Sequence, residues 1–179
     1  MSKSSAEIYV ITGPCGVGKS TISRMIAQNI KKSAFIEGDI LYHMIIGGYV
    51  KPWEDDGTYM ELFWENVLAL TENFIKRGIS VSFEYVVFPE HIVKFLKKFS
   101  ERNIPVNYVV LLADEDTIRE RDSMREVDCR MGERAITLLK QFKGLNIEEK
   151  FILDTTNLSK EQVVRTIMAD DRFLLKPLE

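Results

Sequence analysis

This chain of 179 residues contains few cysteines and prolines, and its net charge is small. Its two cysteines, Cys15 and Cys129, lack the paired spacing of a metal or redox motif. A formal net charge of −3 produces no overall field that would attract nucleic acid or an anionic membrane surface. We therefore expect no disulfide, a reducing cytoplasmic location and no nucleic-acid partner.

Long apolar runs are missing as well. No segment approaches the roughly 18 to 20 apolar residues that span a bilayer, and the N-terminus lacks the apolar core and cleavage site of a signal peptide. We expect no membrane association. The chain is long enough for one well-buried domain and too short for two, so residues 1–179 are predicted to form a single domain.

Short β-rich runs alternate with longer helical patterns along the chain. The predicted strands are 7–12, 33–37, 79–88, 105–112 and 151–154. The predicted helices are 19–32, 58–76, 89–102, a charged helix from 114, 131–143 and 159–169. Residues 40–57 are punctuated by glycine, proline and aspartate and are expected to be irregular. This alternation predicts an α/β fold, with a parallel sheet covered by helices on both faces.

The most specific motif lies between the first strand and the helix that follows it. Residues 13–20 read Gly-Pro-Cys-Gly-Val-Gly-Lys-Ser and match the phosphate-binding pattern G-x-x-x-x-G-K-[ST] in its confirming context. Its glycines let backbone N–H groups approach phosphate oxygens, Lys19 reaches the β- and γ-phosphates, and the Ser20 hydroxyl ligates Mg²⁺. A glycine-rich turn with a chance lysine is the alternative. The predicted nucleotide-binding residues here are Gly13, Pro14, Cys15, Gly16, Val17, Gly18, Lys19, Ser20 and Thr21, with Ser20 as metal ligand and ATP and Mg²⁺ as cofactors.

Three features narrow the class of phosphate-loop protein. The Asn-Lys-x-Asp motif of GTPases is absent. The third strand carries a single acid, Glu84, where AAA-type and helicase ATPases usually end in an Asp-Glu pair, and such ATPases are usually longer. An arginine-rich segment follows the fourth strand, over residues 117–134. With these features the chain resembles the small-molecule and nucleoside-monophosphate kinases of the P-loop group.

That resemblance implies a three-layer P-loop NTPase fold with a five-stranded parallel sheet in the order 2-3-1-4-5. It also implies an acceptor-binding region over about 40–78 and a short lid over about 117–134. By resemblance, Arg121 would lie near the adenine or the phosphates, with Arg119 as its rival, and Arg125 would engage the transferring phosphate. Arginine suits this role because its planar fork pairs with phosphate oxygens. A solvated helix face is the alternative.

The predicted acceptor side begins at Asp39, after the second strand. Gly-Asp-x-x-x-His, ending at His43, resembles gluconate kinases and related small kinases, in which this acid faces the acceptor hydroxyl. A carboxylate there can accept the hydroxyl proton as the new phosphorus–oxygen bond forms. Asp39 could also cap the following helix. His43 falls one helical turn later and could share the cleft or be an ordinary surface residue.

Three further residues are candidates. Glu84, at the end of the third strand, is placed for a magnesium-bound water or for substrate, although gluconate kinases usually carry small polar residues there. Trp53, between a proline and a charged run, could line the acceptor pocket. Thr156, after the fifth strand, belongs to a loop that cups the adenine in related kinases, although such a polar string is also an ordinary turn.

These residues predict an ATP- and Mg²⁺-dependent kinase that phosphorylates a metabolite hydroxyl, such as that of a sugar acid like gluconate. Lys19, Asp39 and Arg125 would be its catalytic residues, and Asp39, His43, Trp53 and Glu84 would bind the acceptor. Nucleoside or nucleotide kinases and antibiotic phosphotransferases are the alternatives among enzymes. An ATP-binding regulatory switch is the alternative outside them. A monomer or a homodimer is expected.

Overall fold

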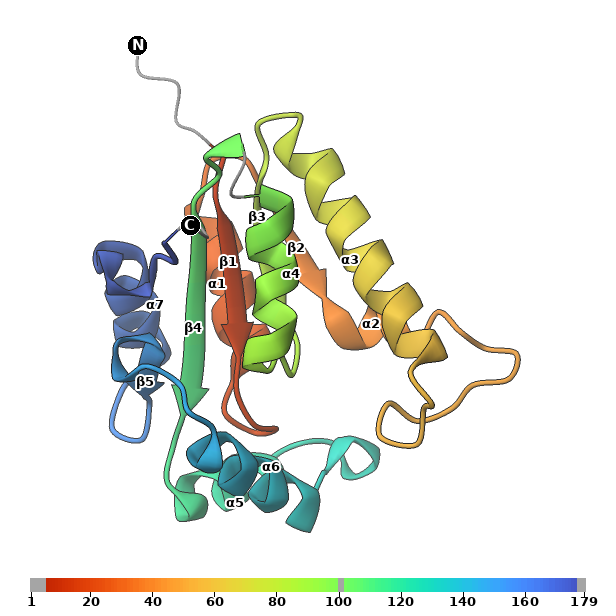
Figure 1. Cartoon of the computed structure of the whole chain (residues 1–179). Coiled ribbons are helices and arrows are strands. Elements are labelled where there is room, and N and C mark those ends of the chain that lie inside the picture. The colour runs from red at the N-terminus through yellow and green to blue at the C-terminus, as the bar shows by residue number, and fades with distance from the viewer. Residues whose placement is uncertain (1–5, 100–101, 177–179) are drawn as a thin grey trace.

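A five-stranded parallel sheet organises the chain, seen here in a computed structural model that describes residues 6–99 and 102–176. Its strands are β1 (Ile8–Thr12), β2 (Ser33–Glu37), β3 (Ser80–Glu84), β4 (Val106–Leu112) and β5 (Ile152–Asp154). They lie in the order β2-β3-β1-β4-β5, and every pairing is parallel (Figure 1). The predicted P-loop NTPase fold and strand order are therefore confirmed.

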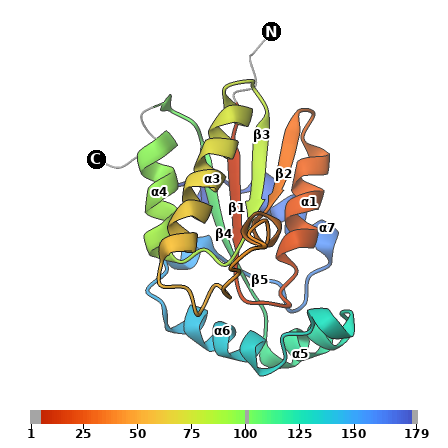
Figure 2. The ribbon, with the colours of Figure 1, turned by 90° about the vertical axis from the view of Figure 1, so that its right-hand side faces the viewer.

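Helices cover both faces of this sheet. The α-helices are α1 (Lys19–Asn29), α2 (Gly38–Tyr42), α3 (Thr58–Ile75), α4 (Pro89–Phe99), α5 (Glu115–Ser123), α6 (Glu133–Gly144) and α7 (Lys160–Ala169). The short 3₁₀ turns are η2 (Val127–Cys129), η3 (Glu149–Phe151) and η4 (Asp171–Phe173). Figure 2 views the sheet from its β2 edge and shows α3 and α4 to its left and α1 and α7 to its right.

Alternate residues of the strands supply two separate cores. Along β1, Ile8 and Val10 pack with the helices α3 and α4, whereas Tyr9 and Ile11 pack with α1 and α7. Side chains of a strand point to opposite faces in turn, so a strand covered on both sides must be apolar throughout. β1 is buried at all five positions. This burial fixes the strand whose end carries the phosphate-binding motif.

The third strand is shorter than the sequence predicts. A strand over 79–88 was expected, but β3 ends at Glu84. The reason lies in the next four residues: the Val87 N–H donates to the Thr12 hydroxyl at 2.7 Å, and the Tyr108 hydroxyl donates to the Val87 carbonyl at 3.2 Å. These side-chain hydrogen bonds replace the sheet ladder and turn the chain away directly after Glu84.

Other boundaries differ by a few residues. The first helix was expected over 19–32 and ends at Asn29, where Ile30 turns to an extended conformation. The short helix α2 occupies the start of the segment 40–57, which was expected to be irregular. The predicted helix 89–102 is observed as α4 to Phe99, and its residues 100 and 101 lie outside the described residues. Ser159 caps α7 in a capping box, as expected.

Two segments rise from the carboxyl end of the sheet. The segment of residues 38–57 with the start of α3 follows β2, and we call it the acceptor segment after the role that the sequence predicts for it. The lid, residues 115–134, consists of α5, η2 and the start of α6 and follows β4. Both lie at the same end of the sheet in Figure 1. Ligands of open α/β sheets bind beyond the carboxyl ends of the strands, so the two segments flank the expected site.

The two cysteines are free, with Cys129 exposed on the lid. Within 6–99 and 102–176, no helix is long and apolar enough to cross a membrane.

Gly38, the first residue of α2, has no room for a larger side chain. A Cβ there would lie 2.5 Å from Cδ2 of Tyr85 and 2.9 Å from the Glu84 carbonyl oxygen. We predict that Gly38→Ala lowers the free energy of unfolding by about 1–3 kcal/mol, because the aromatic ring must move. Thermal denaturation measures this. Gly47→Ala is the matched control, since nothing lies within 4 Å of its added Cβ; equal melting temperatures for the two variants would contradict the prediction.

Candidate active site

The phosphate-binding loop lies between β1 and α1 and needs its glycines. Gly13 has a φ of +137°, and a Cβ there would lie 2.2 Å from the Leu111 carbonyl oxygen. Gly16 and Gly18 also have positive φ, at +81° and +99°. Only glycine adopts such angles without strain. The loop therefore curls so that the N-terminus of α1, with its free N–H groups, opens toward an anion.

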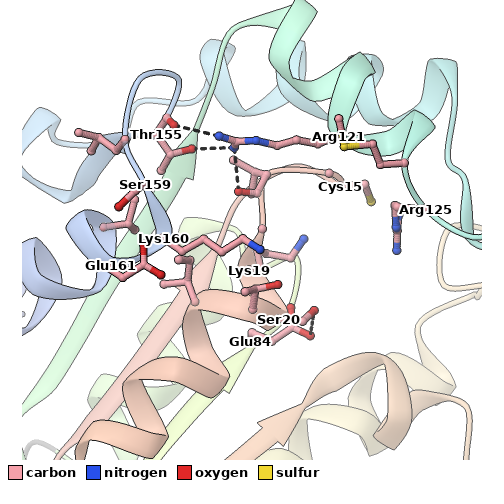
Figure 3. Close-up of a pocket in the computed structure, with 18 of the residues that line it drawn as sticks. Cys15, Lys19, Ser20, Glu84, Arg121, Arg125, Thr155, Ser159, Lys160 and Glu161 are labelled. Atoms are coloured by element: carbon pink, nitrogen blue, oxygen red, sulfur yellow. Dashed lines mark hydrogen bonds between the residues drawn. The ribbon is translucent and has the colours of Figure 1, made fainter.

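A cavity of about 800 Å³ opens above this loop (Figure 3). Residues of the loop, of α2, of β3, of the lid and of the segment around the start of α7 line it together. They are Cys15, Gly16, Val17, Gly18, Lys19, Ser20, Thr21, Ile22, Asp39, Glu84, Arg121, Met124, Arg125, Thr155, Leu158, Ser159, Lys160, Glu161 and Val163. The fold thus brings most of the predicted site residues into one cavity from five parts of the chain.

Ser20 and Glu84 form a pair of oxygen ligands at the floor of this cavity. The Ser20 hydroxyl donates to Oε1 of Glu84 at 3.1 Å. Hydroxyl and carboxylate oxygens are the ligands that Mg²⁺ prefers, and this ion is usually bound by one or two protein groups plus substrate phosphates. No group of three or more His, Cys, Asp or Glu in the described part of the chain could hold a metal alone. The donor set therefore fits Mg²⁺ bound together with a nucleotide.

Glu84 is the buried acid of the site, with 2% of its surface exposed. Burial raises its pKa to about 7, and the Asp39 carboxylate adds to this, while Lys19 and the Ser20 hydroxyl act in the opposite direction. The Lys19 amino group donates to the Pro14 carbonyl at 3.2 Å and so folds back over the loop. Lys19 supplies a positive charge to the phosphate-binding loop, and Glu84 supplies an acid beside it. The two together suit a complex of phosphate and metal, which carries both signs of charge.

Asp39 lies on the acceptor side of the same cavity, in the first turn of α2. It is not the capping residue of that helix, because the N-cap is Glu37. Beside it the Tyr85 ring packs on Gly38. Burial and the neighbouring Asp39 carboxylate raise the pKa of Tyr85 above its ordinary value. Asp39 therefore faces the cavity from a helix whose start is packed against the end of β3.

The lid arginines divide into three environments. Arg121 donates to the Thr155 hydroxyl and carbonyl at 3.1 and 3.0 Å, tying the lid to the loop after β5 (Figure 3). Arg125 points toward the cavity with its side chain 41% exposed and pairs with Asp122 at 3.4 Å. Arg119 pairs with two glutamates of the lid instead and does not line the cavity. Arg121 rather than its rival Arg119 therefore lines the cavity.

Gly13 and Pro14, at the start of the loop, do not line the cavity, and neither do three predicted residues outside the loop. The Nε2 of His43 lies 3.2 Å from the Tyr49 hydroxyl, within the acceptor segment. Trp53 lies beneath the guanidinium of Arg134. The Thr156 hydroxyl accepts a hydrogen bond from the Asp114 N–H at 2.9 Å, and Thr155, its neighbour, is the residue on the cavity wall. The loop after β5 therefore borders the cavity through Thr155, whereas the predicted Thr156 is not among the lining residues.

The start of α7 contributes residues that the sequence did not suggest. Ser159, Lys160 and Glu161 line the cavity, and Figure 3 shows Lys160 extending into it. The capping box marked where this helix begins. The position of α7 beside α1 depends on the strand order, because β5 and α7 reach the cavity only by lying next to β4 and α1.

Comparison with known proteins identifies the family of the chain. A family described as "AAA domain" matches residues 8–141. The chain belongs to this family. The single acid at the end of β3 and the length of the chain had favoured a small kinase over an AAA-type ATPase. The name of the matching family includes the term AAA, and the structure has the P-loop core of that family. No curated protein matches the chain.

Solved structures of similar fold are kinases and a resistance protein. A sugar kinase from Janibacter sp. HTCC2649 is 18% identical with a TM-score of 0.68 and covers 92% of this chain and 93% of its own. A gluconokinase from Sinorhizobium meliloti 1021 is 19% identical with a TM-score of 0.60, covering 92% and 90%. The tunicamycin resistance protein of Deinococcus radiodurans is 19% identical with a TM-score of 0.62, covering 96% and 99%. At these identities the likeness establishes the P-loop kinase fold.

The raised pKa of Glu84 makes a pH-dependent prediction for the unliganded protein. Glu84 binds its proton more tightly folded (pKa about 7) than unfolded (about 4.5), so its contribution to stability falls as the pH rises from 4.5 through 7. That loss is at most about 3 kcal/mol. Glu84→Gln should remove it, so the variant gains stability over the native chain between pH 5 and pH 8.

Thermal denaturation across this range checks the result. Glu65→Gln, which neutralises an exposed acid on α3, is the control and should follow the native profile. Parallel profiles for Glu84→Gln and the native chain would contradict the assignment of a buried, proton-holding carboxyl.

Proposed function

We propose that the protein is an ATP- and Mg²⁺-dependent kinase that transfers the γ-phosphoryl group to a hydroxyl of a small molecule. One observation carries the proposal: the phosphate-binding loop, the Ser20–Glu84 pair, Asp39 and Arg125 all line a single cavity. Asp39 and Arg125 belong to two different segments that border this cavity beside the phosphate-binding loop. A phosphoryl transferase uses such a pair, the carboxylate to accept the hydroxyl proton and the arginine to neutralise the transferring phosphoryl group.

The donor end holds the nucleotide. Backbone N–H groups of residues 13–20 would bind the phosphates, with Lys19 at the β- and γ-phosphates. Ser20 would ligate Mg²⁺ directly, and Glu84 would orient Ser20 and a metal-bound water. When bound, Mg²⁺ neutralises charge on the β- and γ-phosphate oxygens. Arg121 and Thr155 would border the base and the α-phosphate.

The acceptor end supplies the base and the charge that the transfer needs. Asp39 would accept the proton of the acceptor hydroxyl as the oxygen attacks phosphorus. Arg125 would move from Asp122 to the transferring phosphoryl group, whose equatorial oxygens match its planar fork. No covalent enzyme intermediate is required, because positioning and charge neutralisation provide the rate enhancement.

The acceptor is proposed to be a metabolite alcohol, with a sugar acid such as gluconate as the first candidate. The Asp39–His43 spacing and the fold shared with a gluconokinase and a sugar kinase support this choice. His43 and Trp53 remain proposed acceptor residues by their place on the acceptor segment. A nucleoside or nucleotide and an antibiotic are the other acceptors to test. We propose a cytoplasmic monomer or homodimer that acts without nucleic acid.

Asp39→Asn tests the proposed base. It should lower acceptor-dependent phosphorylation by about 10²- to 10⁴-fold, the usual contribution of a general base, and leave the affinity for ATP nearly unchanged. The assay is ADP release with a panel of sugar acids, sugars, nucleosides and antibiotics, together with ATP binding by calorimetry.

Two control variants bracket this result. Lys19→Ala should abolish ATP turnover with the fold intact, and Lys32→Ala, an exposed cation beyond α1, should behave as the native chain. A change in ATP affinity alone for Asp39→Asn would indicate a metal or structural role instead. If no acceptor raised ADP release above the rate with ATP alone, the kinase proposal would fail in favour of an ATP-binding switch.

A further inference from the structure

The acceptor segment and the lid touch through one aromatic contact. The guanidinium carbon of Arg134 lies 3.7 Å from the centroid of the Trp53 ring. Trp53 belongs to a tight turn in which the N–H groups of Glu54 and Asp55 both donate to the Lys51 carbonyl. Arg134 lies in the first turn of α6. An arginine over an indole face at this distance is a favourable cation–π contact.

This contact is the main interaction of the Arg134 side chain. Its Nε is buried and has no hydrogen-bond partner among the described residues, and no ion pair of Arg134 occurs there either. The other lid arginines differ. Arg119 and Arg125 have carboxylate partners, while Arg121 and Arg130 donate to backbone carbonyls. Arg134 is therefore held at the acceptor segment by the indole ring rather than by a carboxylate, although the chain contains 27 aspartates and glutamates.

The joined segments carry the two proposed catalytic groups of the acceptor end. Asp39 precedes the loop 43–57 that contains Trp53, and Arg125 precedes the helix that contains Arg134. Figures 1 and 2 both show this loop reaching the lid at the carboxyl end of the sheet. The far end of the lid is tied to the nucleotide side by the Arg121–Thr155 hydrogen bonds. The lid thus contacts the nucleotide side at one end and the acceptor segment at the other.

We infer that Trp53 and Arg134 form a positioning pair that transmits lid movement on nucleotide binding to the acceptor segment. This inference rests on the proposed function, because it assumes that the cavity binds ATP. Nucleotide phosphates attract Arg121 and Arg125, so the lid helices shift and Arg134 shifts with them. The stacked Trp53 follows, and the acceptor segment closes on the side of Asp39. Neither residue touches a reacting atom.

A stacked guanidinium can fulfil this role without a carboxylate partner. Its planar group contacts the face of the indole ring at 3.7 Å from the centroid, so that a shift of Arg134 displaces Trp53 as well. Lysine, a compact point charge, would keep the charge but lose the planar stacking. The coupling should therefore depend on the shape of the side chain as well as on its charge.

The fluorescence of Trp53 tests the inference directly. The chain has two tryptophans, and Trp64 is 1% exposed in the core whereas Trp53 is 51% exposed, so changes at the surface report on Trp53. The probe is a non-hydrolysable ATP analogue with Mg²⁺, titrated into the native chain. We expect a saturable change in emission and in acrylamide quenching that follows nucleotide binding measured by calorimetry, and that is absent from Trp53→Phe.

Three variants of α6 separate coupling from stability. Arg134→Gln should bind the analogue within about twofold of the native affinity, because it lies outside the cavity, but should lose most of the fluorescence change. Arg134→Lys should restore only part of it. Lys140→Gln, an equal loss of charge at an exposed position of the same helix, should keep all of it. Thermal denaturation checks that each variant is folded.

The possible results test the coupling and the proposed function separately. A change that survives in Arg134→Gln, or its absence from the native chain with nucleotide bound, would overturn the coupling. A chain that binds no nucleotide would overturn both the coupling and the proposed function. Because the measurement needs no acceptor, a kinase assay that fails with every acceptor would reject the transferase proposal and leave the fluorescence result intact.

Discussion

The hydrogen bond between Ser20 and Glu84 is the constraint on which the site depends. It joins the first turn of α1 to the end of β3, across two neighbouring strands. A second, buried bond between the hydroxyls of Ser23 and Ser82 holds the same helix and strand one turn further on. The cradle can present its N–H groups and its metal ligand together only while α1 and β3 keep this register. Glu84 holds this register from a buried position, and the burial raises its pKa.

Around this fixed floor the fold places two segments that have fewer constraints. The lid and the acceptor segment each leave the sheet after a strand and return to it through a long helix. Buried residues anchor both segments in the cores, such as Ile118 of the lid and Tyr42 of the acceptor segment. The contacts that they make across the cavity include polar and aromatic ones, such as Arg121 with Thr155 and Arg134 with Trp53. Such contacts form and break at low cost compared with the apolar cores on either side of the sheet. The coupling that we infer would depend on this difference between the anchored parts of the segments and their contacts across the cavity.

The sequence predicted the strand, loop and helix around the phosphate-binding motif because that motif is local. Lys19 and Ser20 are adjacent in the chain, and the strand before them and the helix after them could be read from periodicity. The end of β3 was placed too late, because residues 85–88 are as apolar as a strand and only the distant Thr12 and Tyr108 turn them away. The choice of Thr155 over Thr156 and the pairing of Trp53 with Arg134 depend on contacts between segments far apart in sequence. Spacing alone carries no signal for such contacts.

Untargeted phosphoryl transfer tests the central claim most directly. The protein is incubated with ATP labelled at the γ-phosphate and a protein-free extract of small metabolites, and the label is followed by chromatography and mass spectrometry. The account predicts a labelled phosphate ester of a small molecule that is absent with Lys19→Ala and strongly reduced with Asp39→Asn. Label that appears only in inorganic phosphate, with no labelled ester from any extract, would contradict it.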